Sequence, residues 1–123
     1  MVGDAVKAGV RMAGGTPLEF QVIHVVDAVV QAMEGMRSVL PSRELVADCV
    51  EVMGQAHPFD GMVLIPGGDK VVPGMLMATA RLNLPSILFY SGVTGSGSYD
   101  GRTIKLEEMW EAVGAFRAGT ISA

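Results

Sequence analysis

The loop at residues 66–70 holds an acid–base pair directly after a short apolar run. Residues 62–65 are uniformly apolar, and after Pro66 and two glycines come Asp69 and Lys70. Because an open α/β sheet binds its ligands beyond the carboxyl ends of its strands, this loop is a candidate site. No nucleophile or thiolate stands beside the pair, and the single cysteine, Cys49, excludes a metal site built from several thiolates. The pair is therefore either a weak metal site or an exposed ion pair.

Other groups that could do chemistry lie outside this loop. Asp27 precedes an apolar stripe, which favours a helix N-cap over a metal ligand. His24 lies inside an apolar run without a recognisable triad, so a core or edge position is favoured over a catalytic base. Gly67-Gly68 and the glycine-rich stretch 91–101 could cradle an anion, although neither follows a known nucleotide-binding pattern.

The periodicity of apolar residues predicts the elements that must position these groups. It indicates helices over 2–13, 28–37, 42–56, 73–82 and 106–117, with strands over 20–26, 62–65 and 86–90. Residues 91–101 are predicted to be a flexible loop. The alternation of helices and strands predicts an α/β fold, with a mostly parallel sheet of three to four strands covered by helices on both faces, as in flavodoxin-like and Rossmann-like sandwiches. We expect a single domain over residues 1–123.

Composition excludes several classes of function. Half of the residues are hydrophobic and the net charge is −4, with no basic stripe, so nucleic acid is not an expected partner. Apolar runs are too short for a membrane span, and the N-terminus lacks the pattern of a signal peptide, so we expect a cytoplasmic protein. A sheet of so few strands has open edges, which predicts self-association as a homodimer.

Long stretches of the sequence resemble one enzyme family. The blocks "AVKAGVRMAGGTPLEF" and "LPSRELVADCVEVMGQAHPFDGMVLIPGGDKVVPGMLMATARLNLPSILF" are similar to the N-terminal domain of the dihydroxy-acid and phosphogluconate dehydratases (IlvD/Edd). The similarity is nearest to the dihydroxy-acid dehydratases of branched-chain amino-acid synthesis. It implies a hydro-lyase that converts 2,3-dihydroxy acids to 2-keto acids with an iron–sulfur cluster on three cysteines, a magnesium ion and a serine base.

The resemblance assigns magnesium-site roles to three residues of this sequence, but it finds no cysteine at the position of a cluster ligand. Asp27 and Asp69 match the magnesium ligands, and Lys70 matches a lysine that is carbamylated in the family. Gly68 stands where the family has a cluster cysteine, while the other cluster cysteines and the serine base correspond to positions outside residues 1–123. We therefore expect no cofactor, and only a relic, weak magnesium site at Asp27, Asp69 and Lys70.

The segment after Asp27 also departs from the family, which is glycine-rich and polar there with a histidine at the place of Met33. Ala28 and Ala32 favour the helix predicted above. The main hypothesis is a noncatalytic structural subdomain, excised from or redesigned on a dehydratase, or else naturally degenerate. The alternatives are an active hydro-lyase and a small anion-binding or nucleotide-binding module of flavodoxin-like shape.

Overall fold

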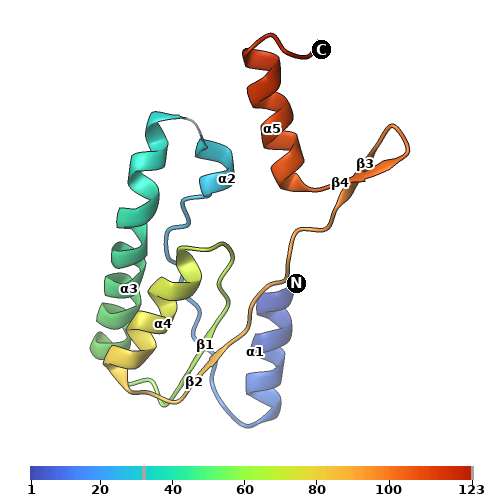
Figure 1. The fold of residues 1–123 in the computed structure, drawn as a ribbon. Helices are drawn as coiled ribbons and strands as arrows, with labels where there is room; N and C mark the ends of the chain where they lie inside the picture. The colour runs from blue at the N-terminus through green and yellow to red at the C-terminus, as the bar shows by residue number, and fades with distance from the viewer. Residues whose placement is uncertain (32, 123) are drawn as a thin grey trace. The chain divides into compact units, whose positions relative to one another are not determined.

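The computed structural model describes residues 1–31 and 33–122, which form two compact units, Met1–Ser91 and Gly92–Ala123 (Figure 1). The first unit contains the helices α1 (Val2–Met12), α2 (Asp27–Val30), α3 (Val39–Ala56) and α4 (Val71–Leu82), the 3₁₀ helix η1 (Glu34–Ser38), and the strands β1 (Met62–Leu64) and β2 (Ser86–Leu88). The second contains β3 (Gly97–Tyr99), β4 (Arg102–Ile104) and α5 (Leu106–Arg117). None of the helices in these ranges is long and apolar enough to cross a membrane.

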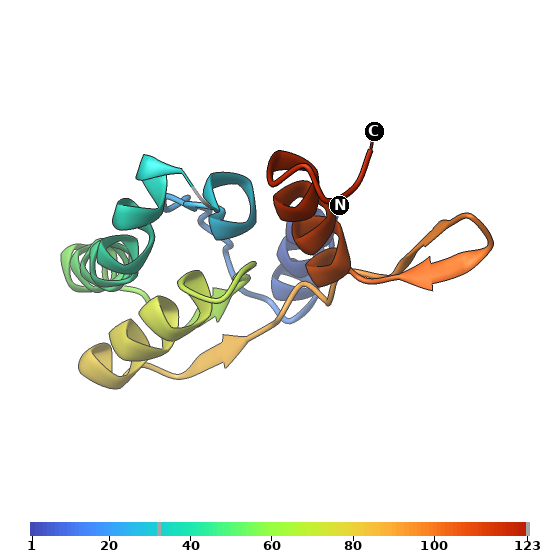
Figure 2. The same ribbon diagram turned by 45° about the horizontal axis from the view of Figure 1, so that its top comes forward.

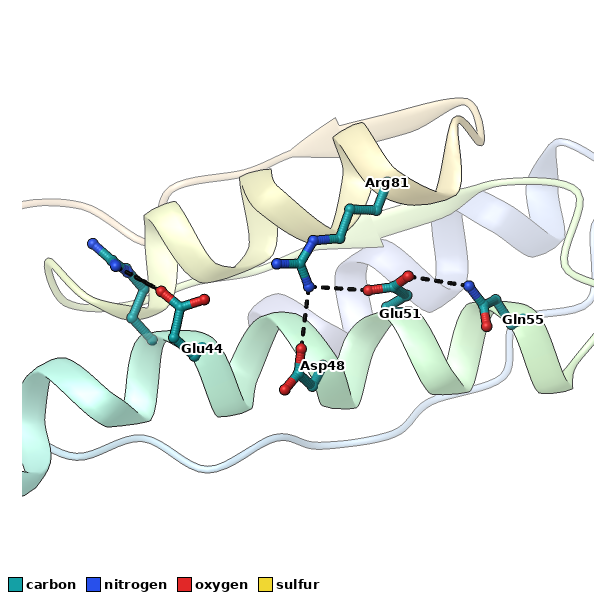
Figure 3. A network of polar contacts seen from close by, with 6 residues as sticks. Glu44, Asp48, Glu51, Gln55 and Arg81 are labelled. Carbon is teal, nitrogen blue, oxygen red and sulfur yellow. Dashed lines mark hydrogen bonds and ion pairs between the residues drawn. The ribbon is translucent and has the colours of Figure 1, made fainter.

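The core of the first unit lies where α3 and α4 pack side by side beside β1 (Figures 1 and 2). Its buried members come from all three elements: Val46, Val50, Leu64, Val71, Met75 and Ala78. Fully burying an aliphatic side chain of this size stabilises a fold by roughly 1.5–3 kcal/mol, so this cluster is the main source of stability. The interface is closed on its polar side by Arg81 of α4, whose Nη1 donates to Asp48 at 3.1 Å and to Glu51 at 3.0 Å on α3 (Figure 3).

Both core helices begin two residues ahead of a proline. α3 begins at Val39 and has Pro41 in its first turn, and α4 begins at Val71 with Pro73 at the same place. Proline is tolerated there because the first N–H groups of a helix have no partner within it. The helix predicted over 42–56 thus begins three residues earlier, and Ser42 lies inside it, where its buried hydroxyl donates to the Val39 carbonyl at 2.6 Å.

The sheet of the first unit is smaller than predicted. β1 and β2 are parallel, with Met62 opposite Ser86 and Leu64 opposite Leu88, so the α/β class is confirmed. Residues 20–26 are extended, but they are not a strand, and the predicted three- to four-stranded parallel sheet is wrong for the described residues. A β-branched run suits a strand, yet a strand also needs a neighbour that accepts its backbone hydrogen bonds.

The continuous helix predicted over 28–37 is wrong. α2 ends at Val30, and Met33 has an extended backbone with φ −114° and ψ 163° before η1 begins; Ala32 lies outside the described residues. Gly35 and the paired β-branched Val29 and Val30 oppose a long helix here. Asp27 is the first residue of α2 and not its N-cap, so that prediction is displaced by one residue.

The second unit contains a β-hairpin that the sequence analysis missed. β3 and β4 are antiparallel, with Tyr99 opposite Arg102, and the turn residues Asp100 and Gly101 have φ of 48° and 70°. An Asp-Gly turn with two positive φ angles matches the twist of a hairpin. The flexible loop predicted over 91–101 is thus wrong from residue 97 onward. α5 forms as predicted, but no residue of α5 is buried, and its Trp110 is only half-buried.

Candidate functional site

The candidate loop lies at the carboxyl end of both parallel strands of the first unit. β1 ends at Leu64, the loop passes through the buried Pro66, and α4 begins at Val71. Ser91, just after β2, fixes the loop, because its hydroxyl donates to the Pro66 carbonyl at 3.1 Å and its backbone N–H donates to the same oxygen at 3.4 Å. The loop therefore occupies the position that the sequence predicted.

The structure brings Asp27, Asp69 and Lys70 together. The Lys70 ammonium donates a hydrogen bond to the Asp69 carboxylate, and its Nζ lies 3.8 Å from Oδ2 of Asp27. The Lys70 side chain is 25% exposed, against 59% for Asp69 and 32% for Asp27. The partly buried Lys70 ammonium thus contacts one carboxylate on the loop after β1 and one at the start of α2, and it links these two segments.

The ion pair shifts both of its titratable partners. The hydrogen bond from the Lys70 ammonium lowers the pKa of the Asp69 carboxyl below its ordinary value of 3.8, while partial burial of the carboxyl acts to raise that pKa. Conversely, the hydrogen bond from the Asp69 carboxylate raises the pKa of Lys70 above the ordinary 10.5. Both groups are therefore charged at neutral pH, and Lys70 is a cation and not an oxygen or nitrogen ligand.

These residues fit magnesium only in part. Asp27 and Asp69 offer carboxylate oxygens, but magnesium demands an octahedral set of oxygen ligands. Within residues 1–31 and 33–122, no group of three or more His, Cys, Asp and Glu side chains is placed to hold a metal ion. The Lys70 ammonium already contacts both carboxylates, through its hydrogen bond to Asp69 and at 3.8 Å from Oδ2 of Asp27. Binding of magnesium to the three residues stays a prediction.

Replacing Lys70 by methionine should raise the pKa of the Asp69 carboxyl toward 3.8, because the hydrogen bond that lowers it is removed. In the unsubstituted protein the lowered pKa means that the ionised Asp69 carboxylate stabilises the fold above pH 3.8, and this stabilisation is lost as the pH falls through the lowered pKa. The stabilisation from the charged Lys70 ammonium is lost only as the pH rises beyond 10.5, through its raised pKa. The change in stability at neutral pH should stay within about 1 kcal/mol, as for exposed pairs. Carboxyl chemical shifts followed by NMR measure the titration directly. Lys7→Met, which removes a separate ion pair with Glu19, is the matched control, and an Asp69 titration unmoved by Lys70→Met would contradict the assignment.

His24 also lies at this loop, which the sequence analysis did not foresee. Gly68 has φ +81°, and a Cβ placed on it would lie only 2.6 Å from Nε2 of His24. His24 is exposed, so the predicted core position is wrong, and because residues 20–26 form no strand it lies on no strand edge either. Sequence alone offered one clue: His24 is three residues from Asp27, in the segment that leads to the ion pair.

The geometry defines a class of protein: an α/β unit with a charged loop beyond the carboxyl ends of its parallel strands. The family model described as "Dihydroxy-acid/6-phosphogluconate dehydratase N-terminal" matches residues 1–123, and the chain belongs to this family. It is 57% identical over 119 residues to a dihydroxy-acid dehydratase of Moorella thermoacetica, covering 97% of this chain and 22% of that protein. It is 52% identical over 121 residues to a dihydroxy-acid dehydratase of Syntrophobacter fumaroxidans, covering 98% of this chain and 22% of the relative. The resemblance inferred from the sequence is thus confirmed, over about a fifth of the length of these relatives.

Proposed function

We propose that this chain is a noncatalytic N-terminal unit of the dehydratase family, in which the position of a cluster ligand has become part of the packed loop. The observation that carries the proposal is at Gly68, where the resemblance places a cluster cysteine. Glycine supplies no ligand there, its φ of +81° is one that other residues rarely adopt, and the imidazole of His24 lies against it.

The residues at this position do not fit an iron–sulfur cluster, which is held by several thiolates. Cys49, the one cysteine of the chain, lies within α3 and not on the loop. The charged residues have a structural role instead, since Lys70 donates a hydrogen bond to Asp69 within the loop and lies 3.8 Å from Oδ2 of Asp27 at the start of α2. No catalytic step follows from this arrangement.

Anaerobic treatment with iron and sulfide tests the proposal. We expect no stoichiometric iron, no visible absorbance from a cluster and no 2-keto acid formed from a 2,3-dihydroxy acid. The dihydroxy-acid dehydratase of Moorella thermoacetica, treated in parallel, is the positive control. Stoichiometric iron in the purified chain, or keto-acid formation, would overturn the proposal. Gly68→Cys alone should not restore turnover, because one thiolate does not hold a cluster.

An active hydro-lyase is the second candidate, and a specific observation favours it. Identity of 57% to a dihydroxy-acid dehydratase is high, and the structure groups the residues matched to the family's magnesium site. In this case the chain would act as part of a longer protein or together with other chains. Keto-acid formation by the isolated chain or by such an assembly would support this candidate over the first.

A further inference from the structure

The helix α5 carries an apolar stripe that the second unit leaves uncovered. Its members recur at helical spacing and share one face of the helix: Leu106, Met109, Trp110, Val113 and Phe116. No residue of α5 is buried, and Val113 and Phe116 remain 49% and 54% exposed. An amphipathic helix in a protein is stabilised mainly by packing of its apolar face, so this stripe requires a partner surface.

The second unit is too small to supply that surface itself. It spans Gly92–Ala123, which is below the roughly 40 residues under which a fold usually needs a disulfide, a metal or association with another chain. A disulfide within the unit is excluded, because the one cysteine, Cys49, lies on α3. Among the residues that the structure describes, no three potential metal ligands come together. Association with a further surface is therefore the means of covering the stripe.

The charges of α5 favour a second α5 in the opposite direction. Glu107 and Glu108 lie in its first turn and Arg117 lies in its last. Arg117 follows Val113 by four residues and so lies on the stripe, while Glu107 precedes Trp110 by three and borders it. Two antiparallel copies place the Arg117 of each near the Glu107 of the other and oppose their helix dipoles, whereas a parallel pair brings the two arginines together. This self-complementary pattern favours a second copy over a surface of different sequence.

We propose that the apolar stripe of α5 is an interaction surface for a second copy of this chain, with the two α5 helices antiparallel. Trp110 and Val113 lie equally far from the middle of α5, so Trp110 of each copy meets Val113 of the other. Gly114 leaves room for Met109 of the other copy, since a Cβ on Gly114 meets nothing within 4 Å. A two-fold axis repeats each contact, as in symmetric dimers. The homodimer expected from the sequence thus forms through a helix and not through the open edges of the sheet.

Light scattering of the full chain over a range of concentrations tests the proposal. We expect the mass to rise from the 12.9 kDa of one chain to twice that value. Trp110 is the one tryptophan, and its emission should move to shorter wavelength over the same concentrations as the second copy covers the ring.

Exchanging the charges tests the direction of the helices. Arg117→Glu should raise the dissociation constant about tenfold, because it replaces attraction by repulsion at two symmetric places. Adding Glu107→Arg to Arg117→Glu restores the antiparallel pairs with their charges exchanged, so the constant should return to within about threefold of its original value. Arg11→Glu is the matched control: Arg11 lies in the last turn of α1, and the same change of charge there should leave the dissociation constant unchanged.

A substitution on the stripe tests its apolar contact. Val113→Asp should leave the chain as one copy at every concentration and keep its circular dichroism spectrum, because valine and aspartate have similar helix propensities. Val52→Asp makes the same change at an exposed valine of α3 and should leave the mass of the dimer unchanged.

Three results would overturn the proposal. One is a mass of one chain at high protein concentration, which with emission from a covered Trp110 would assign the stripe to the first unit of the same chain. Another is a dissociation constant for Arg117→Glu that Glu107→Arg does not restore, which would exclude the antiparallel pair. The third is loss of the dimer by Val52→Asp and not by Val113→Asp, which would assign the contact to α3.

Discussion

Gly74→Ala is expected to lower the free energy of unfolding of the first unit by about 2 kcal/mol, since a methyl group there overpacks the core by up to about 3 kcal/mol and regains about 1 kcal/mol of helix propensity. A Cβ at position 74 would lie 2.7 Å from the carbonyl oxygen of Arg43 and 3.0 Å from the side chain of Val46. The first of these neighbours is backbone of α3, which cannot rotate away. α3 and α4 would have to separate at the centre of the core.

Gly9→Ala is the matched control on α1, because a Cβ at position 9 meets nothing within 4 Å. The same exchange should there stabilise the unit by about 0.5–1 kcal/mol through helix propensity alone. Urea unfolding followed by circular dichroism measures both changes. If Gly74→Ala were neutral or stabilising, the close contact of α3 with α4 would be incorrect.

Local sequence signals predicted the helices that carry the core. The apolar spacing placed α4 and α5 within two residues of their observed bounds, and β1 and β2 follow from short apolar runs. The strand predicted over residues 20–26 is wrong because β-branched residues indicate only that a segment can form a strand, while its pairing depends on a neighbour elsewhere in the chain. The hairpin turn at Asp100-Gly101 was a visible signal, but Gly97 and Ser98 lack the alternating apolar pattern that usually accompanies it.

The candidate site shows the same division between local and distant information. Asp69 and Lys70 are neighbours in sequence, so their ion pair needed only the loop to form. Asp27 came from the family resemblance, and the structure places it near Lys70. His24 was missed because its contact with Gly68 depends on how the extended segment runs beside β1, which no periodicity encodes.

Gly68→Ala is expected to lower the free energy of unfolding by about 2–3 kcal/mol, the sum of a left-handed backbone cost of about 1–2 kcal/mol and about 1 kcal/mol to displace the His24 ring from its rotamer. Gly14→Ala isolates the first cost, because Gly14 has φ +83°, close to the +81° of Gly68, and a Cβ there meets nothing within 4 Å. Gly14→Ala should therefore cost about 1–2 kcal/mol and no more.

The contribution of His24 can then be separated by a double variant. In a His24→Ala background the ring that meets the new Cβ is gone, so Gly68→Ala should cost no more than Gly14→Ala. Chemical denaturation of the single and double variants measures each step. If the cost of Gly68→Ala were unchanged by His24→Ala, the imidazole would not occupy the space beside Gly68, and the packing of the loop described for the proposed function would be incorrect.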